Sequence, residues 1–227
     1  MNRRLADGLS ILLVLGAFGF AAWMYPTLPE QIPTHWNAAG EVDDYTSKPW
    51  GVYVLPLIAA GVFVLMKLIP VISPKGFRTD EFLGVLSLFQ VVLVAFMAAL
   101  TVVTLLYANG ADIPIPRFIG LSVGVLFLIL GNYLGKVRKN FFIGIRTPWT
   151  LASDEVWART HRLGGWLFTF AGLAMIVFAF FDTGFPLTLI VVLVAAFVPV
   201  IYSFVLYRRL EGFGPESDGD DPEEDRR

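Results

Sequence analysis

The residues able to do chemistry are few in this 227-residue chain, and they gather in two short polar segments. The chain has two histidines and no cysteine, which excludes disulfides, thiolate metal sites and a cysteine nucleophile. Asp43 lies eight residues after His35, and Asp154 and Glu155 lie seven and six residues before His161. Neither group has the ligand spacing of a recognised metal site, so we expect no metal and no cofactor.

The same residues do not indicate an enzyme. Ser153, Asp154 and His161 lie near one another in the sequence. However, no motif supplies an oxyanion hole or places the serine on a sharp turn between strand and helix, as acyl-transfer chemistry requires. We therefore predict that the chain has no catalytic activity.

The elements that must position these residues are transmembrane helices. Hydrophobic residues make up 56% of the chain, charged residues 16%, and the mean hydropathy is +0.67. The apolar residues form six blocks whose lengths lie near the roughly 20 residues that cross a bilayer core. The sequence predicts an all-α, multi-pass protein of the plasma membrane with six transmembrane helices, at residues 9–25, 52–71, 82–107, 118–133, 166–181 and 185–207.

The basic residues predict the orientation of these helices. With the N-terminus in the cytoplasm, fifteen of the seventeen lysines and arginines lie inside, and Lys48 and Arg117 lie outside. An even number of helices then places the C-terminus in the cytoplasm too. Residues 1–210 form the predicted membrane domain, and residues 211–227, which hold eight of the nineteen acids, form a predicted disordered acidic tail.

The predicted outer loop, residues 26–51, begins with closely spaced prolines that favour a stiff, extended start, and a turn is expected at Ala39 and Gly40. Its candidate function is to bind an incoming peptide, which the neighbouring acids would attract if it is cationic. The structural alternative is a compact lid whose tryptophan packs on the helix ends. The candidate peptide-binding residues are His35, Trp36, Asn37, Asp43 and Lys48.

The predicted inner loop, residues 134–165, is basic and aromatic in its first half. Arg146 lies between Gly144 and Pro148, where its guanidinium could bind a carboxylate or a lipid phosphate, or could instead tie loop carbonyls together. The bases of this loop could attract anionic lipid or a soluble protein partner, but three clustered bases are too few for direct nucleic-acid binding. Ser153 is expected to cap a short helix lying at the membrane surface.

The helices themselves offer little polar chemistry. Lys67 lies near an inner helix end, and Gln90 and Asn132 are isolated, with no acid inside a predicted span. This disfavours an ion-coupled transporter. Asn132 is expected to hydrogen-bond a neighbouring helix, and two pairs of glycines, Gly16 with Gly19 and Gly120 with Gly124, are expected at close helix contacts.

Both loops resemble those of a known family. Residues 28–43, LPEQIPTHWNAAGEVD, followed by Lys48, resemble the outer loop of the SdpI-like immunity proteins, which are small bacterial and archaeal membrane proteins. Residues 131–136, GNYLGK, and 140–151, NFFIGIRTPWTL, resemble the family's cytoplasmic signature, although Lys139 stands where many relatives have proline. The resemblance covers residues 5–209. Its inner-loop candidates are Asn132, Asn140, Gly144, Arg146, Thr147, Trp149, Thr150, Trp157 and His161.

The resemblance implies a role in immunity, in which the protein protects a cell from a secreted, membrane-active toxin peptide. It also implies a second role, in which the toxin-bound protein holds a soluble transcriptional repressor at the inner face of the membrane. The alternative from another class is a carrier of a small molecule or lipid. A polar face lining a pore would favour the carrier, and a solid apolar bundle would count against it.

Overall fold

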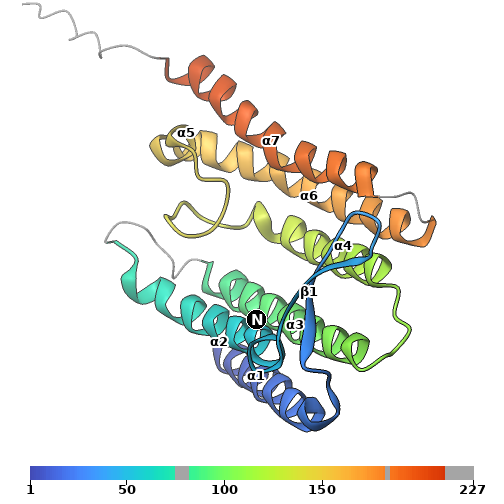
Figure 1. Ribbon diagram of the computed structural model, residues 1–227. Coiled ribbons are helices and arrows are strands. Elements are labelled where there is room, and N and C mark those ends of the chain that lie inside the picture. The colour runs from blue at the N-terminus through green and yellow to red at the C-terminus, as the bar shows by residue number, and fades with distance from the viewer. Residues whose placement is uncertain (75–81, 182–184, 213–227) are drawn as a thin grey trace, which may run out of the picture.

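The computed structural model describes residues 1–74, 82–181 and 185–212, and all that follows concerns these residues. Six of their helices are long and apolar enough to cross a membrane, which confirms the predicted multi-pass, all-α architecture (Figure 1). The predicted tail from residue 213 onward lies outside the described residues. The six helices are α1 Arg3–Met24, α2 Lys48–Ile72, α3 Leu83–Ala108, α4 Ile115–Leu134, α6 Asp154–Phe181 and α7 Phe185–Leu210.

The helices form two groups of three. Helices α1, α2 and α3 pack on one another, and α4 and α7 pack on either side of α6 (Figure 1). The direct helix contact between the groups, α3 with α4, is small. We call the end of the bundle that holds residues 135–153 the basic end, and the opposite end the hairpin end. The base distribution still predicts that the basic end faces the cytoplasm.

The short elements lie at these two ends. A one-turn 3-10 helix, η1 Tyr25–Thr27, leads from α1 into a β-hairpin of strands β1 Gln31–Trp36 and β2 Val42–Ser47. The strands are antiparallel, with Gln31 opposite Ser47 and Trp36 opposite Val42. The expected turn at Ala39 and Gly40 closes the hairpin, and Gly40 has a φ of 82°, which favours glycine. At the basic end, α5 Pro148–Ala152 precedes α6.

The expected short surface helix after Ser153 is wrong as a separate element. Ser153 does cap a helix, because its Oγ accepts a hydrogen bond from the N–H of Val156 at 3.4 Å. That helix, however, is α6, which continues without interruption to Phe181. The glycine pair at 164 and 165 does not break it. Gly165 instead lies against α4, where a Cβ would come within 2.8 Å of the carbonyl oxygen of Gly131.

Close packing of α4 on α6 depends on small residues seven positions apart. Gly124 and Gly131 of α4 face Gly172 and Gly165 of α6, and a Cβ at Gly172 would meet the carbonyl oxygen of Gly124 at 2.5 Å. Such contacts let two backbones approach, which is the usual basis of helix association in a membrane.

Of the two glycine pairs expected at close contacts, one is confirmed. A Cβ at Gly120 would lie 3.0 Å from the Cβ of Ala179, and Gly124 faces α6 as described. The expectation for Gly16 and Gly19 is wrong, because no atom of the described residues lies within 4 Å of a Cβ built at either. In α1 the buried small residues are instead Ala6, Ser10, Ala17 and Ala21.

Candidate functional site

The hairpin, defined as residues 31–47, brings together three of the predicted peptide-binding residues. Nδ1 of His35 lies 2.5 Å from a carboxylate oxygen of Asp43, and both side chains are largely exposed. The amide oxygen of Asn37 accepts from the N–H groups of Ala39 and Glu41 at 2.9 and 3.0 Å, which holds the turn. The exposed imidazole and carboxylate therefore lie on the two strands, next to a turn fixed by Asn37.

The base of the hairpin is seated on the helix ends. Ile32 is fully buried in a cluster with residues of α1, α2 and α3, and a Cβ at Gly51 would lie 2.4 Å from its Cβ. The ring of Trp36 meets the ring of Tyr107 edge-on at 5.7 Å, although the buried Nε1 of Trp36 has no acceptor among the described residues. This is the lid-like packing that the structural interpretation of Trp36 expects.

Lys48 is separated from the other candidates by burial. Its side chain is 10% exposed, its ammonium donates to the carbonyl of Leu28 at 2.8 Å, and it lies over the ring of Tyr25 at 4.9 Å. The carboxylate of Glu30 is 3.7 Å away. Because Lys48 pairs with Glu30 beneath the hairpin, the exposed acids Glu41, Asp43 and Asp44 have no lysine or arginine partner among the described residues.

At the basic end, the signature loop, defined as residues 135–153, is organised first by Asn140. This side chain is fully buried, and its amide nitrogen donates to the carbonyls of Arg138 and Ile143 at 2.8 and 3.1 Å. Its amide oxygen accepts from the N–H groups of Phe142 and Ile143, both at 2.8 Å. All four hydrogen bonds close the loop on itself, so Asn140 has no capacity left for a ligand.

His161 of α6 is the second organiser of the signature loop. Its Nδ1 donates to the carbonyl of Trp157 at 2.9 Å, and its Nε2 accepts from the N–H of Ile145 at 2.9 Å. The imidazole stacks on Trp157, whose own Nε1 donates to the carbonyl of Val137 at 2.8 Å. Gly144 has a φ of 114° and lies so close that a Cβ would be 2.3 Å from Nε2.

The two threonines of the loop start α5 and connect it to α7. Thr147 caps the helix by accepting from the N–H of Thr150 at 3.1 Å, while the hydroxyl of Thr150 lies 2.8 Å from the carbonyl of Ile145. The hydroxyls of Thr147 and Ser203 are 3.1 Å apart. Trp149 meets the ring of Phe204 edge-on at 5.0 Å. This group of contacts joins the loop to the last transmembrane helix.

The remaining inner-loop candidates are exposed. A guanidinium nitrogen of Arg146 donates to the carbonyl of Phe141, the carbonyl-tying arrangement that the structural interpretation expects. Asn132 is exposed near the end of α4, and within the described part of the chain it forms no hydrogen bond with a neighbouring helix, contrary to expectation.

The structure does not bring the two histidines together, because the hairpin and the signature loop lie at opposite ends of the bundle. Within residues 1–74, 82–181 and 185–212, no three His, Asp or Glu side chains are placed to hold a metal ion. Each candidate region is thus a separate surface.

Sequence reasoning missed a polar cluster between α1, α2 and α3. Lys67 lies 2.5 Å from a carboxylate oxygen of Asp7, and Gln90 donates to Asp7 at 3.2 Å and to Ser10 at 3.1 Å. Asp7 lies two residues before the first apolar block, so it is not among the polar residues of the predicted transmembrane helices. The available signal was the spacing of Asp7 and Ser10, which places both on one face of a helix.

We expect Asp7→Asn to lower the free energy of unfolding by about 1–2 kcal/mol, because the Lys67 charge loses its counterion while both groups stay a quarter to a third exposed. Thermal unfolding in detergent measures the change. In an Asp7→Asn, Lys67→Met double variant the loss should be smaller than in Asp7→Asn alone. A loss in the double variant equal to the sum of the losses in Asp7→Asn and Lys67→Met would show that the pair is not energetically coupled.

Known proteins match both candidate regions. The model of the SdpI/YfhL protein family matches residues 136–203, and that of a domain of unknown function (DUF1648) matches residues 12–60. The chain is 28% identical to the Immunity protein SdpI of Bacillus subtilis (strain 168) over 206 residues, which are 90% of this chain and 97% of that protein. No solved structure matches the chain. The hairpin lies within the second match, and the signature loop from Lys136 onward within the first.

Proposed function

We propose that this chain, an SdpI-like membrane protein of the immunity type, protects the cell that makes it from a secreted, membrane-active toxin peptide. The observation that carries the proposal is its likeness to the Immunity protein SdpI along nearly the whole length of both chains. The proposed role is one of binding, without catalysis. In it, the hairpin end faces outward and the basic end faces the cytoplasm.

The acidic side chains of the hairpin support a cationic peptide as its ligand. His35 contacts Asp43 and lies opposite Asp44 in the hairpin, Glu41 is exposed at the turn, and Lys48 is buried. Such a surface attracts positive charge and raises its local concentration. In the proposed mechanism, the peptide contacts His35 and Asp43 at the turn and is kept from the lipid around the bundle.

A second part of the proposal places a soluble repressor protein at the basic end. The surface for it would be the exposed side of the signature loop around Arg146. On the buried side, Asn140 and His161 already make hydrogen bonds within the protein. Transmission from the hairpin would require two arrangements of the helices with different affinities for the peptide. The direct contact of α3 with α4 is small, which would permit two arrangements only if the buried cluster of Ile69, Phe89, Val137 and Trp157 that joins the groups also repacks.

The competing proposal is a carrier of a small molecule or lipid. The cluster of Asp7, Lys67 and Gln90 is the observation in its favour, since charged side chains within spans often mark a translocation path. Against it, the two charges are paired with each other, and the close glycine packing of α4 on α6 leaves no gap between those helices.

Survival under toxin challenge tests the immunity proposal. The chain is expressed in a sensitive bacterium and exposed to the family's toxin peptide at matched membrane abundance of each variant. We expect His35→Ala and Asp43→Asn each to lower the toxin concentration that the cells survive by about tenfold. This is the effect of losing about 1.4 kcal/mol of binding free energy. Both residues are exposed, so their loss should leave the fold intact.

Asp112→Asn is the matched control, because Asp112 is an exposed acid at the same end that lies outside the hairpin. It should protect as well as the wild type. An inserted wild-type chain that gives no protection would refute the immunity proposal and favour the carrier. Equal losses in all three variants would refute the specific role of the hairpin turn.

A further inference from the structure

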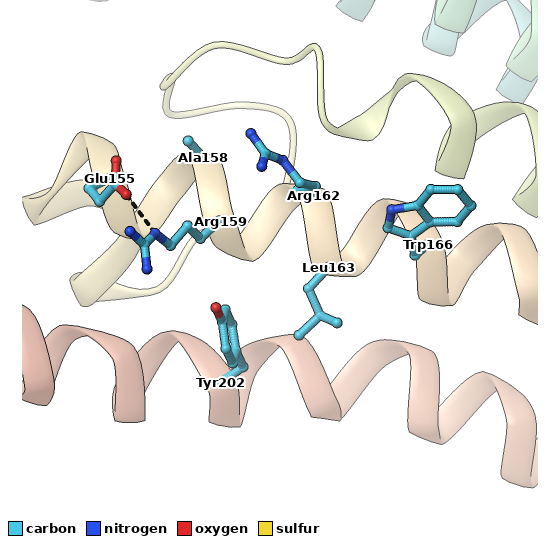
Figure 2. A pocket seen from close by; sticks show the side chains of 7 residues that line it. All are labelled: Glu155, Ala158, Arg159, Arg162, Leu163, Trp166 and Tyr202. Atoms are coloured by element: carbon cyan, nitrogen blue, oxygen red, sulfur yellow. Dashed lines mark hydrogen bonds and ion pairs between the residues drawn. The ribbon is translucent and has the colours of Figure 1, made fainter.

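A groove runs along α6 at the basic end of the bundle, outside both candidate regions. Its volume is about 490 Å³, and six of its residues recur on one face of α6 while the seventh comes from α7 (Figure 2). They are Glu155, Ala158, Arg159, Arg162, Leu163, Trp166 and Tyr202. Figure 2 shows Tyr202 rising from α7 toward the part of α6 that carries Arg159, with Arg162 one turn further along.

The charges in this groove are not equally available. Arg159 is bound by Glu155, whose carboxylate oxygen lies 2.5 Å from its Nε (Figure 2). Arg162 is exposed and has no acidic partner within the described part of the chain. An anion entering the groove would therefore meet the free guanidinium of Arg162 first, and Arg159 second.

Along α6, basic side chains are followed by aromatic ones, in the same order as the phosphate and the acyl chains of a phospholipid. Trp166 is 61% exposed and begins the apolar part of α6, which places its ring at the headgroup level. With a rise of about 1.5 Å per residue, Arg162 lies about 6 Å and Arg159 about 10 Å further toward the water. Beyond Trp166, the exposed ring of Phe170 stacks on it at 5.8 Å, in the region of the acyl chains.

We propose that this groove binds one anionic phospholipid, with its phosphate on Arg162 and Arg159 and its glycerol and upper acyl chain against Leu163, Trp166 and Phe170. A guanidinium fork suits a phosphate, and the Tyr202 hydroxyl supplies a further donor. A soluble phosphate compound would find the same cationic groups but would not use the aromatic surface. The depth of Trp166 and Phe170 is the reason to assign the site to a lipid.

Native mass spectrometry of the detergent-purified protein tests the assignment, with phosphatidylglycerol, phosphatidylcholine or glycerol 3-phosphate added. We expect the wild type to retain one phosphatidylglycerol in preference to phosphatidylcholine, and to retain no glycerol 3-phosphate. Arg162→Gln should weaken phosphatidylglycerol binding about fivefold, as expected for one base near an anionic headgroup. Arg159→Gln should have a smaller effect, since Glu155 already engages that side chain.

A gain of affinity makes the test stringent. Glu155→Gln frees Arg159 and removes a negative charge from the groove, so it should tighten phosphatidylglycerol binding by a few-fold. Arg3→Gln, Arg4→Gln is the matched control, because it removes two exposed bases from the same end of the bundle but from α1. It should bind phosphatidylglycerol like the wild type.

Each contrary result overturns the proposal. If the control loses as much binding as Arg162→Gln, the attraction is a general effect of charge at this end. If glycerol 3-phosphate displaces phosphatidylglycerol at equal concentration, the groove is a site for soluble anions. If neither Arg162→Gln nor Glu155→Gln changes binding while both variants keep the wild-type unfolding temperature, the lipid lies elsewhere. None of these results depends on toxin resistance, so the immunity proposal stands or falls separately.

Discussion

Gly144→Ala is expected to lower the free energy of unfolding by about 3–5 kcal/mol. The methyl group would lie 2.3 Å from Nε2 of His161, and residue 144 has a φ of 114° that L side chains rarely adopt. Backbone strain of this kind costs about 1–3 kcal/mol, and displacing the imidazole leaves the part-buried N–H of Ile145 without its acceptor at a similar cost. Thermal unfolding in detergent, and the fraction of chain recovered folded from membranes, measure the loss.

Gly110→Ala separates the two causes. Gly110 also has a positive φ, 93°, but a Cβ built there would have no neighbour within 4 Å in the described part of the chain. It should therefore show the cost of backbone strain alone and destabilise clearly less than Gly144→Ala. Combining Gly144→Ala with His161→Ala should cost less than the sum of the two single changes. Equal losses at Gly144 and Gly110 would contradict the proposed contact with His161.

Gly172→Ala should be the second most damaging of the changes predicted here, with a loss of about 3 kcal/mol. Its methyl group would meet the carbonyl oxygen of Gly124 at 2.5 Å and the backbone nitrogen of Leu128 at 2.7 Å. These are backbone atoms of α4, so relief requires the two helices to move apart, and overpacking of this kind costs about 1–3 kcal/mol or more. Unfolding of the purified protein by increasing sodium dodecyl sulfate, followed by tryptophan fluorescence, measures it.

Gly16→Ala is the matched control for this helix contact. Gly16 is also a glycine within a transmembrane helix, but nothing lies near its Cβ position. The change should be neutral or stabilise by about 0.5–1 kcal/mol, because alanine favours the helix. A loss at Gly16 as large as that at Gly172 would mean that the detergent environment, and not the α4–α6 contact, decides the cost.

The transmembrane helices could be predicted because hydropathy alone requires them. Each apolar block contains most of one helix, but hydropathy gives no information on how far a helix continues once it leaves the lipid. For this reason α6 was expected to begin near Trp166, and its first turns, which carry His161, were assigned to a separate surface helix. The face used for packing was likewise unpredictable for Gly16, since glycine spacing identifies a candidate and not the partner helix.

The candidate regions were predictable in sequence and much less so in geometry. The expected turn at Gly40 is present, yet the strand pairing was not predicted, because β2 is mostly polar and shows no alternation of buried and exposed residues. The interpretation of Arg146 as a tie for loop carbonyls agrees with its bond to Phe141. The burial of Lys48 and the partners of His161 depend on residues distant in the chain, which no local pattern specifies.

The hydrogen bonds of the signature loop have a consequence for how the chain is made. Residues 135–153 precede α7 in the chain, but two hydrogen bonds of this loop come from residues after 200. The hydroxyl of Ser203 lies 3.1 Å from that of Thr147, and Ser153 donates to the carboxylate of Glu211 at 2.8 Å. Synthesis proceeds from the N-terminus, so a growing chain must hold this loop incompletely bonded until α7 has entered the membrane. These two hydrogen bonds therefore cannot form before α7 is in place beside α5 and α6.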